Sequence, residues 1–174
     1  RQGVAEPVTI DAQGRIAQAE VTSCGLNDGW LVGSGTYPAY IACVLYYEKT
    51  VAKEDRIACI TQDGEDRECP PGQYIRGISN GCIVGYRYFE GGALQSIQLK
   101  LRGKAKGTLY VTCHEEGGCA QKLPENAVGS CVCDIDTEEW ETLTIPVQIP
   151  AGVYPLYFRF RGEGSFDLSE FTLE

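Results

Sequence analysis

The last 35 residues of the chain alternate apolar and polar side chains with a period of two. Three runs carry this pattern, residues 140–147, 152–160 and 165–173. Such a period sends one row of side chains into a core and the other into water, as β-strands do. Residues 150–152 and 162–164 separate the runs, and their proline and glycines favour chain reversal. The pattern predicts three antiparallel strands that need a second sheet to cover them.

The preceding segments can supply that sheet. Short apolar runs separated by turn residues occur at 40–47, 74–78, 82–89, 94–101, 108–113 and 130–135. Residues 8–21 read as a hairpin that turns at Gly14, and the charged excursion at 49–72 has room for at most one short strand. No window of 11 residues has a helical period. About ten short strands predict an all-β protein, a two-sheet antiparallel β-sandwich of jelly-roll type.

The length of the chain suits one domain. At 174 residues it can bury a good core once, but two domains would be small. We expect residues 1–16 to be a strand or linker from an upstream domain, and residues 17–174 to form the β-sandwich. The chain starts at Arg1 and has no methionine, so we expect it to be part of a longer polypeptide.

The net charge limits the classes of partner. With 15 Lys and Arg against 24 Asp and Glu, the formal charge is −9. An acidic surface repels phosphate backbones and anionic lipids, so we expect neither nucleic acid nor a membrane as partner. No apolar run approaches the roughly 20 residues of a membrane helix.

The chain has nine cysteines, an odd number. A disulfide framework usually supports small secreted domains without a large core, and this chain is long enough to have one. Cys43 and Cys82 lie within apolar runs and resemble small buried hydrophobic residues. The cysteine usage therefore favours a reducing compartment, the cytoplasm, over secretion.

Two other kinds of chemical site can be weighed from residue types alone. Cys113, His114, Cys119, Cys131 and Cys133 are potential zinc ligands, but their spacing lacks paired Cys-x2-Cys knuckles. A Cys–His nucleophile pair would lack the surrounding signature of a catalytic site.

An acidic cluster raises a further possibility, because two carboxylates can form a glycosidase pair. Its members are Asp134, Asp136, Glu138 and Glu139. Charged surface residues are the commoner explanation for such a cluster, as exposed loop residues are for the cysteines and His114.

Several stretches together resemble the pattern of family 6 carbohydrate-binding modules. They are residues 80–86 (NGCIVGY), 140–143 (WETL), 152–158 (GVYPLYF) and 166–171 (FDLSEF). The resemblance covers about residues 74–174, and Gln18-Ala19-Glu20 adds a weak three-residue match.

The segment at residues 21–43 looks like the one that joins such modules to bacterial family 43 glycoside hydrolases, mostly arabinofuranosidases and xylosidases. Nothing in the chain resembles the propeller domain or the carboxylates of those enzymes. The resemblance therefore implies a C-terminal, non-catalytic module of a bacterial family 43 enzyme.

The resemblance also implies a sugar-binding cleft formed by Tyr86, Trp140 and Asp167. Aromatic rings stack on the apolar C–H faces of pyranoses, while a polar side chain reads the hydroxyl groups. Asp167 stands where the family has Asn, and a carboxylate only accepts hydrogen bonds. The alternative is that Tyr86 and Trp140 are core or rim aromatics of the sandwich.

A second binding surface of the family uses a concave sheet face, for which Trp30, Tyr37 and Tyr40 are candidates. The family's structural calcium maps to Gln18, Glu20 and Ser169. Calcium takes six or more oxygen ligands including carboxylates, so Ser169 removes one negative ligand. No other cofactor is expected.

We therefore expect a non-catalytic module that binds a plant cell-wall polysaccharide or oligosaccharide of the xylan or arabinoxylan type for a covalently attached glycosidase. The alternative is a structural accessory domain that packs against the catalytic domain without binding sugar. Asp167 and the excursion at 49–72 favour that alternative. A free-standing enzyme is the third hypothesis.

Overall fold

The computed structural model describes residues 5–48, 52, 58–64, 72–114, 123 and 125–174. These residues form nine strands and one 3-10 helix, η1 (Ala39–Ile41). The strands are β1 (Leu31–Val32), β2 (Gly35–Pro38), β3 (Val44–Tyr47), β4 (Cys59–Gln62), β5 (Gln73–Ser79), β6 (Cys82–Gly91), β7 (Leu94–Thr112), β8 (Gly129–Ile149) and β9 (Gly152–Leu173). The all-β prediction is confirmed. Among these residues no helix has the length and apolar character to cross a membrane.

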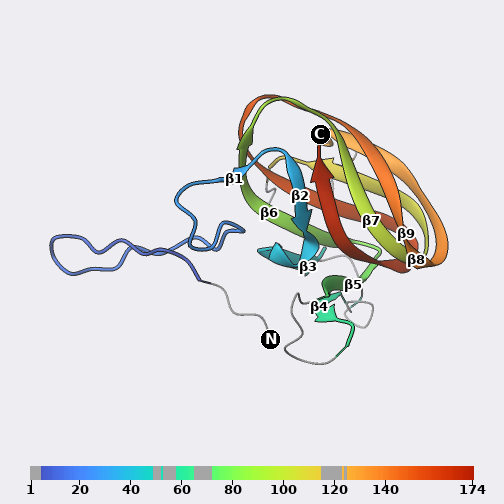
Figure 1. The fold of residues 1–174 in the computed structure, drawn as a ribbon, viewed down its shortest axis with the longest axis horizontal. Helices are drawn as coiled ribbons and strands as arrows, with labels where there is room; N and C mark the ends of the chain where they lie inside the picture. The colour runs from blue at the N-terminus through green and yellow to red at the C-terminus, as the bar shows by residue number, and fades with distance from the viewer. Residues whose placement is uncertain (1–4, 49–51, 53–57, 65–71, 115–122, 124) are drawn as a thin grey trace.

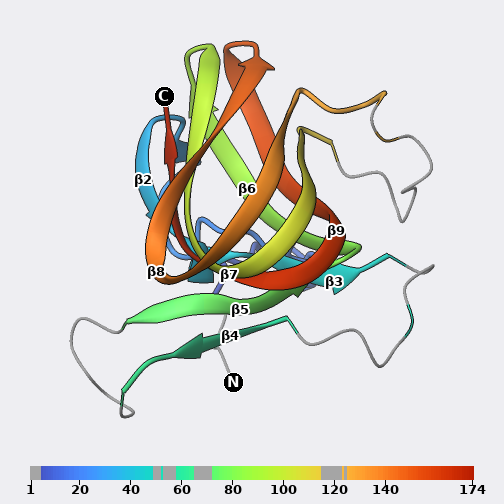
Figure 2. The same cartoon turned by 90° about the vertical axis from the view of Figure 1, so that its right-hand side faces the viewer.

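The strands form one continuous sheet that curls into a sandwich (Figure 1). The first half of β9 pairs with β6, and its second half pairs with β5 and β2. β7 pairs with β9 and β8 along most of its length. Figure 2 shows β7, β8 and β9 bending together like a U around the core. The predicted jelly-roll sandwich is therefore confirmed, with one parallel pair, β1 with β6.

The predicted chain reversal at residues 162–164 is wrong, because β9 runs through it for 22 residues. β7 likewise joins the predicted strands 94–101 and 108–113, and β8 joins 130–135 and 140–147. Glycine has a different role at residues 162–164, where β9 bends without reversing. A Cβ atom on Gly162 would lie 2.6 Å from the Cα of Gly107 on the neighbouring strand. The missing side chains let the backbones of β7 and β9 approach closely where both strands bend.

The core lies inside the U. Its buried side chains include Ile97, Leu99 and Leu101 of β7, Ile145, Val147 and Ile149 of β8, and Leu156, Phe158, Phe160, Phe166, Leu168 and Phe171 of β9. The alternating apolar positions of these strands are thus the inward ones, as predicted. Burying each such side chain stabilises the fold by about 1.5–3 kcal/mol.

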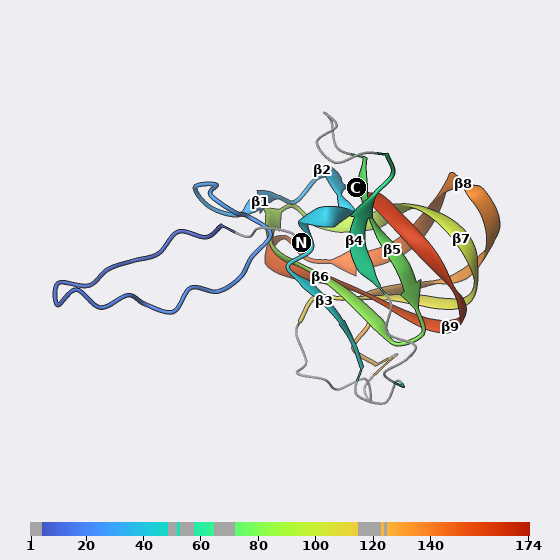
Figure 3. The same cartoon turned by 90° about the horizontal axis from the view of Figure 1, so that it is seen from below.

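The N-terminal residues lie outside this body. Residues 5–21 form a narrow loop that extends away from the sandwich (Figures 1 and 3). The predicted hairpin is present in outline only, with one bridge between Ile10 and Ile16. The backbone N–H of Asp11 donates to the carbonyl oxygen of Arg15 at 3.0 Å and closes its turn. The proposed boundary after residue 16 stays a prediction.

The cysteines in the described residues are free thiols. Cys82 and Cys133 are fully buried, and burial raises the pKa of Cys82 to about 12 and that of Cys133 to about 11. Cys82 thus behaves as the small buried apolar residue that the sequence predicts, whereas Cys43 is only half-buried, with its thiol 3.6 Å from the carbonyl oxygen of Gly85. The expectation of an exposed loop residue is wrong for Cys133, which is buried within β8. Cys69 and Cys119 lie outside the described residues. The cellular compartment stays a prediction.

Candidate functional site

Trp140 belongs to a cluster of aromatic and charged side chains on the outer surface of the sandwich. The half-buried indole of Trp140, on β8, meets the ring of Tyr74, on β5, edge to face with ring centres 5.6 Å apart. The guanidinium carbon of Arg102, on β7, lies 4.3 Å from the centre of the Trp140 ring and 4.9 Å from that of Tyr74. A cation over aromatic faces is attracted by the negative charge of the rings. Three strands therefore hold the indole in one place.

Two carboxylates fix the guanidinium of Arg102. Its Nε donates to Oδ2 of Asp167 at 3.3 Å, and its Nη2 donates to Oδ2 of Asp63 at 3.0 Å. Tyr74 donates its hydroxyl proton to Oδ1 of Asp63 at 2.8 Å, and the N–H of Gly77 donates to Oδ1 of Asp167 at 3.0 Å. Every side chain of the cluster thus has a partner.

These contacts set the charges of the cluster. The hydrogen bond from Tyr74, followed by that from Arg102, lowers the pKa of Asp63 despite some burial. Burial opposes the charge of Arg102, but its hydrogen bonds to Asp63 and Asp167 outweigh this and raise its pKa. Arg102 and Asp63 are both charged at neutral pH as a result.

An open groove of about 870 Å³ adjoins this cluster. Residues of β7, β8 and β9 line it, and Arg102 and Asp167 are among them. The other charged side chains that line it are Lys104, Lys106, Asp134, Asp136, Glu138 and Glu163. Lys104 contacts Asp136 at 2.5 Å and Lys106 contacts Asp134 at 3.2 Å. The groove therefore offers hydrogen-bond donors and acceptors side by side.

The same ion pairs bear on the acidic cluster considered from the sequence. Asp134 and Asp136 each face a lysine of β7, so they form cross-strand salt bridges. Surface ion pairs therefore account for these two carboxylates, which is the commoner explanation named from the sequence.

The prediction that Tyr86 stacks on a sugar is wrong, because its side chain is fully buried. Its ring centre lies 4.5 Å from that of Phe171 and 5.8 Å from that of Phe158. Its hydroxyl donates to the carbonyl oxygen of Ala39 at 3.0 Å, and burial raises its pKa well above the usual value. Tyr86 is the core aromatic that the alternative interpretation described.

Arg102 contacts both Trp140 and Asp167, but both carboxylate oxygens of Asp167 already accept hydrogen bonds from the protein, and the sugar-binding role of this pair stays a prediction. Tyr74 and Arg102 were not identified from the sequence. Alternation along β7 places Arg102 on the face opposite the buried Leu101, which is a usable signal. The partner of Arg102 depends on the register between β7 and β9, which sets Arg102 opposite Asp167. Sequence alone does not specify that register.

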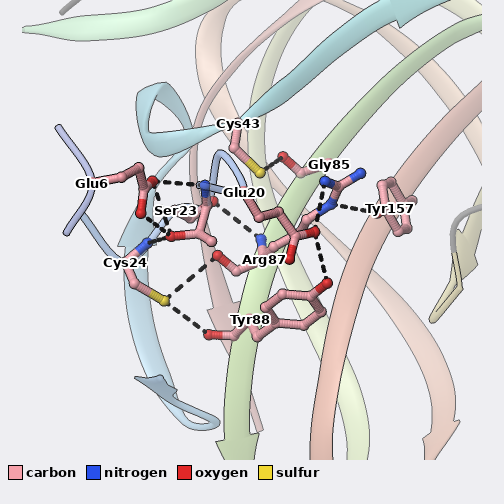
Figure 4. Close-up of polar contacts among 10 residues, drawn as sticks. Glu6, Glu20, Ser23, Cys24, Cys43, Gly85, Arg87, Tyr88 and Tyr157 are labelled. Atoms are coloured by element: carbon pink, nitrogen blue, oxygen red, sulfur yellow. Dashed lines mark hydrogen bonds and ion pairs between the residues drawn. The ribbon is translucent and has the colours of Figure 1, made fainter. Parts of the chain in front are cut away.

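The residues proposed for calcium do not fit the ion. Oε1 of Glu20 lies 3.0 Å from Nη1 of Arg87 and accepts the hydroxyl of Tyr88 at 2.9 Å (Figure 4). The hydroxyl of Ser169 donates to the carbonyl oxygen of Lys100 at 3.2 Å, and Gln18 is exposed. A guanidinium already neutralises the one carboxylate of the set. Within the described residues no three His, Cys, Asp or Glu side chains converge as a metal site would require.

The zinc ligand set is not assembled either in the described part of the chain, from which Cys119 is missing. Burial raises the pKa of Cys113 to about 12 and that of Cys131 to about 11. The thiolate form that binds metal is therefore disfavoured at these positions.

The candidates for a second sugar surface differ in how far they are buried. Trp30 is 47% exposed and meets Tyr88 edge-on at 5.1 Å. Tyr37 packs against Phe171 with ring centres 5.8 Å apart. Tyr40 is half-buried at the 3-10 helix. Of the three, Trp30 is the one with a largely accessible ring.

A scan of the chain against protein-family models finds no match. A sequence relative, a xylosidase/arabinosidase of Thermoclostridium stercorarium, is 35% identical over 181 residues. The match covers 99% of this chain but 36% of the relative. The chain thus spans about a third of the length of this relative.

Solved structures resemble the fold more widely. A glycoside hydrolase family 43 arabinoxylan arabinofuranohydrolase from Bacillus subtilis, solved with cellotetraose, has a TM-score of 0.64 and 15% identity over 95% of this chain and 32% of that chain. CsCBM6-3 from Clostridium stercorarium, solved with cellobiose, has a TM-score of 0.62 and 15% identity over 84% of this chain and 97% of that module.

A family 6 carbohydrate-binding module from Clostridium cellulolyticum, solved with xylose, has a TM-score of 0.56 and 13% identity over 82% of this chain and 98% of the module. At these identities the structural likeness establishes the fold, while the sequence relative establishes kinship along nearly the whole chain. The chain thus has the fold of family 6 carbohydrate-binding modules, and it is related in sequence to about a third of the length of a xylosidase/arabinosidase.

Proposed function

We propose that the chain is a non-catalytic carbohydrate-binding module whose sugar site consists of Trp140 and the adjoining groove. The observation that carries this proposal is a partly exposed indole that contacts Arg102, which also lines the open groove with its paired cations and carboxylates. An indole offers a flat apolar surface to the C–H face of a sugar ring. Sugar hydroxyls both donate and accept hydrogen bonds, and lysines next to aspartates supply both functions.

The cluster around Trp140 suits this role because it is already ordered. The indole is held by Arg102 and Tyr74, and Arg102 in turn is held by Asp63 and Asp167. A ring that is fixed before the ligand arrives loses little conformational entropy on binding. In this proposal Asp167 orients Arg102 at the edge of the groove, and the charged side chains of β7 and β8 read the sugar hydroxyls.

We further propose a ligand of the xylan or arabinoxylan type. Two of the similar proteins support it, namely a xylosidase/arabinosidase and an arabinoxylan arabinofuranohydrolase. A module of this kind holds the polysaccharide near an attached catalytic domain and so raises the effective concentration of substrate at that domain.

Isothermal titration calorimetry on residues 1–174 tests the proposal with xylohexaose, an arabinoxylo-oligosaccharide and cellohexaose. We expect binding of the xylan-type ligands and a loss of at least about tenfold in affinity for Trp140→Ala, which corresponds to about 1.4 kcal/mol. Trp30→Ala removes the only other tryptophan and is the matched control, with unchanged affinity.

Two results would contradict the proposal. The first is no heat of binding with any of the three oligosaccharides. The second is binding that survives Trp140→Ala and is lost with Trp30→Ala, which would move the sugar site to the surface around Trp30. Preference for cellohexaose would retain the site and overturn the xylan assignment.

A further inference from the structure

The exposed apolar side chains of the described residues are concentrated in one segment. Of the nine large apolar side chains that are strongly exposed, seven lie between residues 8 and 32. They are Val8, Ile10, Ile16, Val21, Leu26, Trp30 and Val32, with exposures from 46% to 75%. Single exposed apolar residues are normal on protein surfaces, but a concentration of them marks an interaction surface. We call residues 8–32 the apolar segment.

The outer part of the apolar segment has little support of its own. It extends from the sandwich in Figures 1 and 3, and its strands touch through the Ile10–Ile16 bridge. The N–H of Ala17 donates to the carbonyl oxygen of Thr9 at 3.1 Å, which extends the pairing by one bond. An isolated two-stranded ribbon is marginally stable in water. Contact with another surface would both cover its apolar side chains and stabilise its pairing.

The base of the apolar segment is firmly attached to the module (Figure 4). The N–H of Ser23 donates to the carbonyl oxygen of Arg87, and the N–H of Arg87 donates to Oγ of Ser23 at 3.2 Å. Glu20 pairs with the Arg87 side chain, whose Nε donates to the hydroxyl of Tyr157 at 2.9 Å. The segment is therefore presented in a set direction from β6.

The comparisons indicate which partner covers this surface. The sequence relative matches 99% of the chain, so the match includes the apolar segment, and the relative is nearly three times as long. The Bacillus subtilis enzyme matches 95% of the chain, whereas the module CsCBM6-3 matches 84% and leaves about 28 residues unmatched. The apolar segment therefore occurs within a longer relative, and the remaining two thirds of that protein is the partner surface considered for it.

We propose that residues 8–32 are the surface by which this module docks onto the catalytic domain of a glycoside hydrolase on the same polypeptide. The contact buries the apolar side chains of the segment against an apolar patch of that domain. Its rigid base at Ser23 and Arg87 fixes the angle between the two domains. The proposal rests on the association with a glycosidase and is independent of the sugar site at Trp140.

Hydrogen exchange measured by mass spectrometry tests the contact by comparing the natural full-length polypeptide with residues 1–174 alone. We expect amides of residues 8–21 to exchange at least about tenfold more slowly in the full-length protein. Residues 130–134 of β8 are the control, because they expose Val132 at 71% but belong to the body of the sandwich. Their exchange is expected to be the same in both proteins.

The double variant Ile10→Ser and Ile16→Ser in the full-length protein should return residues 8–21 to fast exchange and leave oligosaccharide affinity unchanged. Equal exchange of the segment in the two proteins would overturn the proposal, as would a natural polypeptide without a glycosidase region. Protection in residues 1–174 alone, together with dimers in sedimentation, would assign the surface to a second copy and also overturn it. Loss of sugar binding in every sample would contradict the sugar site and leave this comparison intact.

Discussion

β7 and the N-terminal segment both carry apolar side chains on an extended chain, but the two are buried to opposite degrees. Ile97, Leu99 and Leu101 of β7 are at most 1% exposed, whereas Ile10 and Ile16 are 65% and 66% exposed. β7 has a neighbour on each side and a second layer over its inner face. In the outer part of the N-terminal segment, the backbone pairing of the described residues is the Ile10–Ile16 bridge and the bonds beside it, all within the segment. The difference shows that an apolar extended segment becomes core only where another layer covers it.

The largest expected effect concerns the bend that creates that second layer. Gly162→Val places a side chain against the backbone of β7, because even a Cβ atom would lie 2.6 Å from the Cα of Gly107. The two strands would have to separate, so we expect a loss of more than about 4 kcal/mol in the free energy of unfolding, or no folded protein. Denaturant titration followed by circular dichroism measures it.

Gly92→Ala is the control for the bend, since a Cβ atom there meets nothing within 4 Å. Its free energy of unfolding should stay within about 0.5 kcal/mol of the wild type. A Gly162→Val protein of normal stability would show that close approach of β7 and β9 is not what allows these strands to bend.

The next effect tests the comparison directly with two isoleucines. Ile97→Ala should cost about 2–5 kcal/mol of unfolding free energy in residues 1–174, because it opens a cavity in the core. Ile10→Ala should cost less than about 0.5 kcal/mol in the same protein, because that side chain contacts water. Thermal and denaturant unfolding of both variants provide the measurement. Equal losses would mean that the N-terminal segment is part of the folding core.

A smaller effect distinguishes Tyr86 from Trp140, the two rings that the family resemblance assigned to one sugar site. Tyr86→Phe removes the hydrogen bond to the carbonyl oxygen of Ala39 and should cost about 1–2 kcal/mol of unfolding free energy. Its oligosaccharide affinity should equal that of the wild type, since Tyr86 is buried. Calorimetry on the folded variant checks this point. A selective loss of sugar affinity would restore Tyr86 to the binding site.

The smallest effect depends on pH. Because its folded-state pKa is lowered, Asp63 stabilises the folded protein above its ordinary pKa of about 4, and this contribution is lost as the pH falls through the lowered value. The unfolding free energy of the wild type should therefore exceed that of Asp63→Asn at pH 6 and approach it at strongly acidic pH. Urea titrations across this range measure the difference. If the difference in unfolding free energy between the two proteins did not change with pH, the charge on Asp63 would not contribute to stability.

Much of the fold follows from the sequence because a period of two specifies strands and their inward faces. The lengths of β7 and β9 were misjudged because glycine has two uses. At residues 103–107 and 162–164 glycines looked like turns, but they allow two neighbouring backbones to bend in close contact. Local sequence does not distinguish these uses, since the partner strand decides between them.

The site was only partly predictable for a similar reason. Trp140 and Asp167 were found through the family resemblance, and the structure brings them together around Arg102. Tyr86 was wrongly assigned to the sugar site. Alternation predicts a strand, but it does not show which part of that strand is covered by a second layer. Arg102 and Tyr74 were missed because cross-strand register brings them together, and register is a property of the assembled sheet.

The acidic residues of β8 have a consequence for how copies of the module meet. In the described part of the sheet β7 is the partner strand of β8, and the two ends of β8 meet where the N–H of Gln148 donates to the carbonyl oxygen of Val128. Between these ends, the outer edge of β8 has no partner strand among the described residues. Unprotected edges recruit strands from other molecules and lead to aggregation. Glu138, Glu139 and Glu141 are exposed along this strand, and two such edges brought together at neutral pH repel each other. The carboxylates thereby keep a crowded population of modules from joining into larger sheets.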